Sequence, residues 1–286
     1  MLVRPWIPSS GRDQNRDVDA PSGHPDHRRV VSRRRLVAGA VVGVGALFTT
    51  RHVVGLDAFG DGATISGAQQ AERLSRPDRR RWSTEQVGSS VEGRPIHLLS
   101  NAAEHSQATV LAIAAVHGDE RGAGAVGADL TTVVVPAGVS AFVVPIANPD
   151  GWARGIRNNA NDVDLNRNFP WWWDRRDGGP SPASEPETQA LIAVVQRLRP
   201  TVTVWIHQPY EYVSPIDPQV RPLAETWATA AGLSIRPFVS QHGGGESWTY
   251  YGEGLASILV EGVTRESSIG EISAHRRGFE ALLAAL

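Results

Sequence analysis

Four apolar runs rich in β-branched residues most constrain the fold of this 286-residue chain. The runs are TVLAIAAV (109–116), SAFVVPI (140–146), TVTVWI (201–206) and SILV (257–260). None of them alternates between apolar and polar residues, which is typical of strands that are buried on both faces. The runs therefore predict the inner strands of a sheet that other elements cover on both sides.

Three stretches with helical spacing of apolar residues lie between these runs. They are RGAGAVGADLTTVV (121–134), EPETQALIAVVQRLR (185–199) and PLAETWATAAG (222–232). Ser184 and Glu187 form an S-x-x-E pattern, typical of a capping box whose side chains satisfy free backbone amides at a helix start. Strands that alternate with helices predict a single α/β/α layered domain with a central, twisted sheet that is mixed but mostly parallel.

The first 51 residues differ in charge from the rest of the chain. They carry nine Arg against four Asp, whereas the remainder carries 19 Arg against 26 acidic residues. Ser32, Arg33 and Arg34 resemble the start of a twin-arginine export signal. The apolar residues 36–48 that follow are too few for an ordinary membrane span but match the hydrophobic region of a signal peptide. We therefore expect residues 1–51 to be a twin-arginine-like signal or anchor segment.

This interpretation predicts an exported protein that is secreted or resides in the cell envelope. Residues 36–48 would tether it to the membrane if the signal stayed uncleaved, and the sequence leaves cleavage, the true translation start and the oligomeric state open. A basic arm that binds nucleic acid is the alternative interpretation of residues 1–51. The charged residues 52–81 follow as a linker, and we expect 82–286 to form the catalytic domain.

Polar side chains follow three of the four apolar runs directly. His117 follows the first run, His207 the third and Glu261 the fourth. Ligands gather at the carboxyl ends of strands in open α/β sheets, so these groups are expected to converge. A single histidine at a strand end is more often structural, but several such groups together favour a site.

Any metal in this chain must be held by His, Asp or Glu, because the sequence contains no cysteine. In the stretch VHGDERGAG (116–124), His117 and Glu120 are spaced so that both can point toward one ion at the start of a helix. With His207 they form a set of two histidines and one carboxylate, which is typical of catalytic zinc. The alternative is that His117 and Glu120 are simply the polar start of a surface helix.

The stretch NPDGWARGIRNNANDVDLNRNFP (148–170) makes this pattern more specific. Together with the residues above, it resembles the signature of the zinc metallocarboxypeptidases of the carboxypeptidase A family. That signature runs H-x-x-E, N-P-D-G, an arginine, D-x-N-R-N, a late histidine and a late glutamate, and the resemblance covers roughly residues 82–286. Within the family the chain looks most like the short bacterial murein peptide amidases. N-P-D-G is also good turn chemistry, so Asn148 and Asp150 are read as structural.

The resemblance implies a role for each matching residue. Glu261 corresponds to the general acid/base, and Arg157 to the arginine that stabilises the developing oxyanion. Asn166 and Arg167 correspond to the pair that grips the substrate's free carboxylate. Asp164 corresponds to the carboxylate that orients the first ligand histidine. A surface ion pair is the alternative for each arginine.

The segment GGGESW (243–248) aligns with a G-G-x-x-x-W segment of the family. In relatives the position of Glu246 lies at the base of the pocket for the side chain beyond the cleaved bond. The resemblance therefore implies that Glu246 favours a leaving residue with a cationic group. The alternative is a Gly-rich loop in which Glu246 faces water.

The sequence thus predicts an enzyme with one Zn²⁺ per chain that hydrolyses an amide bond next to a free carboxylate. The resemblance points to the γ-D-glutamyl-diaminopimelate bond of cell-wall peptides, with a peptide or muropeptide as partner and no nucleic acid. A general metallocarboxypeptidase that removes a C-terminal, possibly basic, residue is one alternative. A catalytically inactive carboxypeptidase-like binding module is another.

Overall fold

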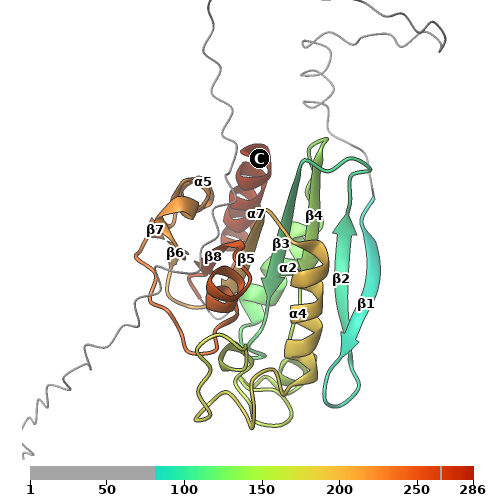
Figure 1. The fold of residues 1–286 in the computed structure, drawn as a ribbon. Coiled ribbons are helices and arrows are strands. Elements are labelled where there is room, and N and C mark those ends of the chain that lie inside the picture. Colours follow the sequence, from blue (N-terminus) through green and yellow to red (C-terminus); the bar gives the residue numbers. More distant parts are fainter. Residues whose placement is uncertain (1–80, 265) are drawn as a thin grey trace, which may run out of the picture. The chain divides into compact units, whose positions relative to one another are not determined.

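The computed structural model describes residues 81–264 and 266–286, which form an α/β domain built on one eight-stranded sheet (Figure 1). The sheet order is β1-β2-β4-β3-β5-β8-β6-β7. The strands, in chain order, are β1 (Ser83–Ser89), β2 (Pro95–Asn101), β3 (Ala108–Ala114), β4 (Val139–Val144), β5 (Val202–His207), β6 (Tyr212–Pro215), β7 (Ser234–Ile235) and β8 (Ala256–Glu261).

The four predicted runs form the four central strands, and these are parallel to one another. β4 pairs with β3, β3 with β5, and β5 with β8, each in parallel register. Outside this block β2 is antiparallel to β4, and β6 is antiparallel to β8. The prediction of a mixed sheet with a parallel centre is therefore confirmed.

Helices cover both faces of the sheet. They are α2 (Arg121–Leu130), α3 (Pro149–Arg154), α4 (Pro186–Leu198), α5 (Arg221–Ala231), α6 (Gly245–Ser247) and α7 (Ile269–Ala284), with shorter helical turns η1 (Leu165–Arg167), η2 (Pro218–Val220) and η3 (Trp248–Gly252). α4 lies on the face nearest the viewer in Figure 1.

Two apolar cores lie on opposite faces, and β3 contributes to both. Val110 and Ala112 pack with α2, α5 and α7, whereas Leu111 and Ile113 pack with α4. Successive side chains of a strand point to opposite faces, so a strand that feeds two cores must be apolar at every position. The unbroken apolar run of β3 is thus the sequence counterpart of the layered architecture.

The start of α4 differs from the predicted capping box. The N-cap residue is Glu185, and no side chain caps the helix. Ser184 instead donates a hydrogen bond to the carboxylate of Glu185, and buried Glu187 accepts hydrogen bonds from the amide of Val91 and the side chain of Asn159. The prediction was wrong because Glu187 bonds to the β1–β2 turn and to the 159 loop rather than to its own helix start.

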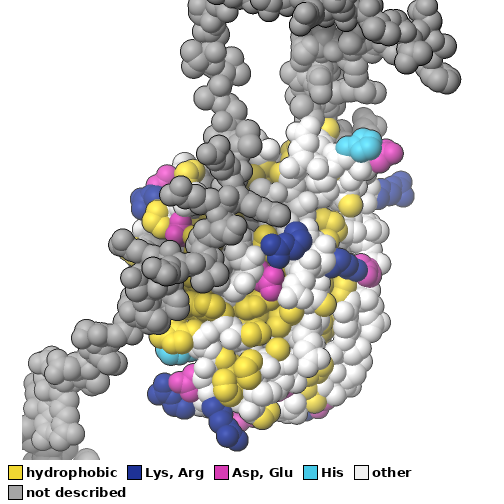
Figure 2. All heavy atoms as spheres, in the orientation of Figure 1, with side chains coloured by type: hydrophobic (Ala, Val, Ile, Leu, Met, Phe, Trp, Pro, Cys, Tyr) yellow, Lys and Arg dark blue, Asp and Glu magenta, His cyan; other side chains and the backbone are white. Residues whose placement is uncertain are grey.

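Arginines on the α4 face lie beside acidic side chains (Figure 2). At the end of α4, Arg197 pairs with Glu85 and Arg199 with Glu253. Such exposed pairs are worth about 0–1 kcal/mol each, so they mark a solvated surface rather than a source of stability.

The predicted signal or anchor segment 1–51, and the linker 52–81 apart from its last residue, lie outside the described residues. Within the part of the chain that the structure describes, no helix is both long and apolar enough to cross a membrane.

Candidate functional site

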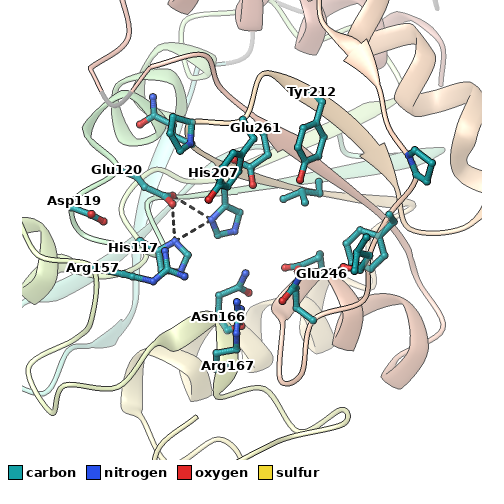
Figure 3. A pocket seen from close by; sticks show the side chains of 18 residues that line it. His117, Asp119, Glu120, Arg157, Asn166, Arg167, His207, Tyr212, Glu246 and Glu261 are labelled. Carbon is teal, nitrogen blue, oxygen red and sulfur yellow. Dashed lines mark hydrogen bonds and ion pairs between the residues drawn. The ribbon is translucent and has the colours of Figure 1, made fainter. Parts of the chain in front are cut away.

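A pocket of about 300 Å³ opens at the carboxyl edge of the parallel strands. His207 and Glu261 are the last residues of β5 and β8, and His117 and Glu120 lie in the loop between β3 and α2. All four line the pocket, as do Arg157, Asn166, Arg167 and Glu246 (Figure 3). Asp164 lies behind His117. The structure therefore brings together the residues that the sequence singled out.

His117, Glu120 and His207 form a compact buried cluster, with one potential ligand atom from each residue within 4.8 Å of the others. Nδ1 of His117 lies 2.7 Å from Oε1 of Glu120, and Nδ1 of His207 lies 3.2 Å from Oε2 of the same carboxylate. The two histidine Nδ1 atoms are 3.3 Å apart. Figure 3 shows the three side chains pointing toward one another.

The cluster fits a metal ion such as zinc. Bonds of about 2.0–2.1 Å from a tetrahedral zinc ion place two nitrogen ligands about 3.3–3.4 Å apart, close to the observed separation of the Nδ1 atoms. Oε2 of Glu120 is buried and makes no hydrogen bond of good geometry among the described residues, although Nδ1 of His207 lies 3.2 Å away. A buried carboxylate oxygen left in this state is costly unless a cation neutralises it.

Asp164 orients the first histidine of the cluster. Its Oδ1 lies 3.1 Å from Nε2 of His117, so the Nε2–H group donates and the lone pair of Nδ1 is left facing Glu120 and His207. Oδ1 also accepts the amide of Asn166. A histidine that binds a metal is commonly fixed in this way by a carboxylate on its other nitrogen.

Electrostatics in the cluster favour positive charge on its two histidines. Burial lowers the pKa of His117, but the carboxylates of Glu120 and Asp164 outweigh it and raise the pKa to about 9. Burial acts in the opposite direction on Glu120, where His207 and His117 hold the pKa down to about 2. The carboxylates of Glu120 and Asp164 therefore favour positive charge at the point where the three side chains meet.

Glu261 lies on the neighbouring strand and behaves differently. Burial raises the pKa of its carboxyl to about 7; Glu120 adds to the shift and His207 opposes it. Its Oε2 is buried with no hydrogen-bond partner among the described residues. A carboxyl with a pKa near neutrality can both accept and release a proton at physiological pH.

Arg157 is held by Asp164 through two hydrogen bonds. Nε and Nη2 of Arg157 donate to Oδ2 of Asp164 at 3.1 and 2.8 Å. Its remaining N–H groups make no hydrogen bond within the described residues, and the side chain lines the pocket. Arg157 is therefore an exposed cation at the pocket wall that is anchored by an ion pair with Asp164.

Asn166 and Arg167 lie on η1, directly below the metal cluster in Figure 3. Oδ1 of Asn166 accepts the amide of Gly245, and Nη1 of Arg167 donates to the carbonyl of Asn166. Gly243 has φ +61°, and a Cβ there would lie 1.9 Å from the carbonyl oxygen of Arg167. This close approach of two backbones requires glycine, and it fastens the 243–246 segment to η1.

Glu246 is buried, with an exposed fraction of 1%, on the short helix α6. It therefore does not face water, and the alternative of a solvated Gly-rich loop is wrong. Its Oε2 has no hydrogen-bond partner within the described part of the chain. Trp248, two residues after Glu246, stacks on Phe169 with ring centroids 5.3 Å apart. This contact supports the part of the pocket wall that carries Glu246.

Asn148 and Asp150 have the structural roles expected of N-P-D-G. Asn148 caps α3 by accepting the amide of Gly151. Asp150 is fully buried and accepts hydrogen bonds from Ser90 and from the amide of Glu92. The loop that carries Arg157 is thereby joined to the β1–β2 turn.

Five polar pocket residues were not singled out from the sequence. They are Asp119, Gln208, Tyr210, Tyr212 and Gln241, which line the pocket together with the predicted residues. Tyr212 lies on β6, opposite Glu261 in the β6–β8 register. β6 was missed because only four residues pair there, too few for a periodic pattern to be detected.

Comparison with known sequences identifies relatives of this chain. A family model described as zinc carboxypeptidase matches residues 69–253, a range that stops before Glu261. Murein peptide amidase A of Escherichia coli (strain K12) is 33% identical over 215 residues, which cover 69% of this chain and 84% of the relative. Murein peptide amidase A of Vibrio campbellii is 31% identical over 215 residues, covering 68% of this chain and 85% of the relative.

Solved structures resemble the fold. The crystal structure of murein-tripeptide amidase from Escherichia coli O157 matches with a TM-score of 0.56 and 29% identity, and covers 74% of this chain and 94% of that one. Carboxypeptidase A from Helicoverpa armigera matches with a TM-score of 0.57 at 19% identity, covering 76% and 71% of the two chains. The second likeness concerns the fold alone.

Proposed function

Since the chain belongs to the zinc carboxypeptidase family and is a metallopeptidase, we propose that it cleaves the γ-D-glutamyl-diaminopimelate bond of cell-wall peptides. Two relatives that match over most of their length are named murein peptide amidase A, and this supports a cell-wall peptide as substrate. The reaction is hydrolysis of an amide bond next to a free carboxylate.

One observation carries the proposal: a buried His117, Glu120 and His207 cluster with Glu261 beside it at the same sheet edge. These three residues would hold a single Zn²⁺, with both histidines binding through Nδ1. Zinc supplies a Lewis acid that polarises the scissile carbonyl and lowers the pKa of water to about 7. A binding module without activity would not need a carboxyl with a pKa near neutrality beside this cluster.

The other pocket residues have different roles toward the substrate. Glu261 accepts a proton from the attacking water and passes it to the leaving amine. Arg157, anchored by Asp164, donates to the oxygen of the scissile carbonyl as negative charge develops there. Asn166 and Arg167 bind the free carboxylate, where the guanidinium of Arg167 offers planar, bidentate donors.

Glu246 selects a leaving residue that carries a positive charge. Its carboxylate is buried in the pocket wall and its Oε2 has no hydrogen-bond partner among the described residues. A buried, unpaired carboxylate is unfavourable in the free protein and favourable once an ammonium group reaches it. The amine of diaminopimelate meets this requirement, and so does a terminal Lys or Arg, which is the alternative of a general carboxypeptidase for basic residues.

Mass spectrometry of reaction products tests the proposal. The purified zinc-loaded protein is incubated with muropeptides and, separately, with ordinary peptides that end in Lys, Arg or Phe. We expect release of diaminopimelate from muropeptides. Cleavage of ordinary basic peptides alone would replace the murein assignment with the alternative, and no cleavage at all would favour the inactive module.

A second measurement tests Glu246 itself. The ratio of kcat/KM for a muropeptide to that for a matched peptide ending in Phe is compared between the wild type and Glu246→Gln. Loss of a buried charge pair should lower this ratio by at least about tenfold. An unchanged ratio would remove Glu246 as the selector.

Export completes the proposal. The twin-arginine-like segment around Arg33 and Arg34 would direct a folded enzyme to the cell envelope, where cell-wall peptides are present. Residues 36–48 would either be removed or remain as a membrane tether.

A further inference from the structure

Arg236 is a cation beside the pocket that lacks a carboxylate partner within the described residues: it lies over the ring of the pocket residue Tyr212 and directly precedes the pocket-lining residues 237–239. No acidic side chain within the described residues lies within ion-pair distance of its guanidinium, although exposed arginines such as Arg197 and Arg199 are paired. The contact that the structure gives its side chain is with Tyr212, whose ring centroid lies 5.0 Å from Cζ of Arg236. A guanidinium over a tyrosine ring is held in place by the ring without being neutralised.

The strand pattern directs Arg236 toward the pocket face of the sheet. The amide of Arg236 donates to the carbonyl of Val213, which continues the β6–β7 pairing by one residue. Val213 and Ile235 belong to the core beneath α5 and α7, whereas Tyr212 packs against the opposite core. Because side chains alternate along a strand, Arg236 shares the face of Tyr212.

The segment that follows Arg236 forms part of the pocket wall. Pro237, Phe238 and Val239 line the pocket together with Tyr212. In Figure 3 the ring of Tyr212 enters the pocket from the side opposite Asn166 and Arg167, with Glu261 and Glu246 nearby. Burial raises the pKa of Tyr212 to about 12, and the carboxylates of Glu261 and Glu246 contribute to this. Its hydroxyl therefore remains a hydrogen-bond donor at neutral pH.

The pocket beyond the scissile bond thus presents both signs of charge. Glu246 offers a buried anion in its wall, the Tyr212 hydroxyl offers a donor in the same wall, and Arg236 offers a cation next to that donor, over the Tyr212 ring. No ion pair joins the two groups within the described residues, so each is free for a ligand. A single cationic side chain, such as that of lysine, satisfies only the first of them.

We infer that Arg236 and Tyr212 bind a carboxylate at the far end of the leaving residue, while Glu246 binds the ammonium group beside it. The pocket would then recognise a complete amino-acid head group, with an ammonium and a carboxylate on one carbon, rather than an amine alone. This specificity rests on the proposed function, because it concerns the leaving residue of the same reaction. It makes Arg236 the residue that separates a diamino dicarboxylic acid from lysine.

Three tripeptides isolate the two charges. Each has the form L-Ala-γ-D-Glu-X, where X is meso-diaminopimelate, L-lysine, which lacks the far carboxylate, or 2-aminopimelate, which lacks the far ammonium. The kcat/KM of each is measured for the wild type, Arg236→Gln, Tyr212→Phe and Glu246→Gln. Arg277→Gln is the matched control, since Arg277 is also exposed and, within the described residues, its side chain bonds only to the carbonyl of Ala230.

Each variant other than the control should change one ratio of kcat/KM between two of the tripeptides. Arg236→Gln should lower the preference for diaminopimelate over lysine by about fivefold, a size typical of an exposed charge pair. Tyr212→Phe should lower it as well, because the ring that supports Arg236 remains and only the hydroxyl is lost. Glu246→Gln should lower the preference for diaminopimelate over 2-aminopimelate, and Arg277→Gln should change neither ratio.

Binding of the free amino acids separates failure of this inference from failure of the proposed function. Calorimetry with meso-diaminopimelate, lysine and 2-aminopimelate needs no turnover. A preference for diaminopimelate over lysine that Arg236→Gln reduces would support the inference even if no γ-D-glutamyl peptide were cleaved. An equal affinity of the wild type for the two amino acids, or a preference that survives Arg236→Gln, would overturn it.

Discussion

His207 and Glu261 are register partners at the ends of two neighbouring parallel strands, β5 and β8. Adjacent strands lie about 4.8 Å apart, so the sheet itself fixes the spacing between the imidazole proposed to bind zinc and the carboxyl proposed to carry protons. Both side chains are buried, and both strands are covered by helices on either face. The two groups are thus held by the buried centre of the sheet rather than by a loop.

Removal of either histidine from the cluster should abolish zinc binding. His117→Ala and His207→Ala each leave two protein ligands, and a site with two ligands binds zinc weakly. Inductively coupled plasma mass spectrometry of the purified proteins measures the zinc content. His97→Ala, which changes an exposed histidine of β2, is the control and should retain one zinc per chain. Full occupancy in either cluster variant would contradict the assignment.

Glu261→Gln should keep zinc and the fold but lose turnover. An amide of the same size cannot shuttle a proton, and general acid–base catalysis typically contributes about 10²–10⁴-fold. The measurement pairs kcat with zinc content and a thermal unfolding curve on the same preparation. Near-normal kcat in this variant would mean that another group carries the proton.

Substitutions of Arg157 and Arg167 should affect different kinetic parameters. Arg157→Gln removes a donor to charge that develops in the transition state, so kcat should fall by about a hundredfold. Arg167→Gln removes a contact with the substrate carboxylate, so its main effect should be a higher KM. Arg154→Gln, which breaks an exposed ion pair with Glu92, is the matched control. A shared effect of both variants on KM alone would refute the role of Arg157.

His275 should make the protein less stable in acid. Burial against Trp227 lowers the pKa of His275 from its ordinary value of 6.5 to about 4, and Glu271 partly opposes this shift. Above pH 6.5 the histidine is neutral in both states, and the stability of the folded form is fully present. As the pH falls from 6.5 to about 4, only the unfolded form binds the proton, so this stability is progressively lost. The total is about 3 kcal/mol, since each pKa unit corresponds to about 1.4 kcal/mol.

Urea unfolding of metal-free wild type and His275→Leu between pH 7 and 4 measures this loss. Other groups titrate in both proteins, so the difference between the two free energies of unfolding isolates His275. We expect that difference to change by about 3 kcal/mol across the range. If the free energies of unfolding of the two proteins changed with pH in parallel, His275 would not be responsible for the loss of stability in acid.

Export should depend on the twin arginines. Changing Arg33 and Arg34 together to Lys should leave the protein in the cytoplasm, because the pathway reads the arginine pair. Fractionation of cells that produce each protein, followed by immunoblotting, measures the distribution. Unchanged secretion would indicate another signal or an internal start, and a reporter fused to residues 1–60 distinguishes these from a nucleic-acid-binding arm.

The central strands could be predicted because their sequences carry a strong signal. β3, β4, β5 and β8 are buried on both faces, so nearly every residue is apolar. β1 carries no such signal, since most of its residues are exposed and it pairs only with β2 at the sheet edge. The capping prediction at Ser184 failed for a related reason. A local pattern cannot reveal that Glu187 is needed by the distant Val91 and Asn159.

The site was predictable where each residue follows a strand or a motif directly. His117, His207 and Glu261 stand at strand ends, and Arg157 and Arg167 lie within one motif-bearing loop. Tyr212 and Arg236 carried no motif, because their relation to the pocket comes from the antiparallel pairing of β6 with β8 and from the short β7. Such contacts depend on the tertiary register and leave no trace in local spacing.

The contact of Gly243 with Arg167 limits how this pocket could be redesigned. Any side chain at Gly243 would meet the Arg167 backbone, and any side chain at Gly245 would meet the ring of Trp205. The backbone of this Gly-rich segment is therefore among the least replaceable parts of the pocket wall. Protein engineers who seek a new leaving-group preference should leave the backbone of this segment unchanged and vary only the side chains that project from the wall.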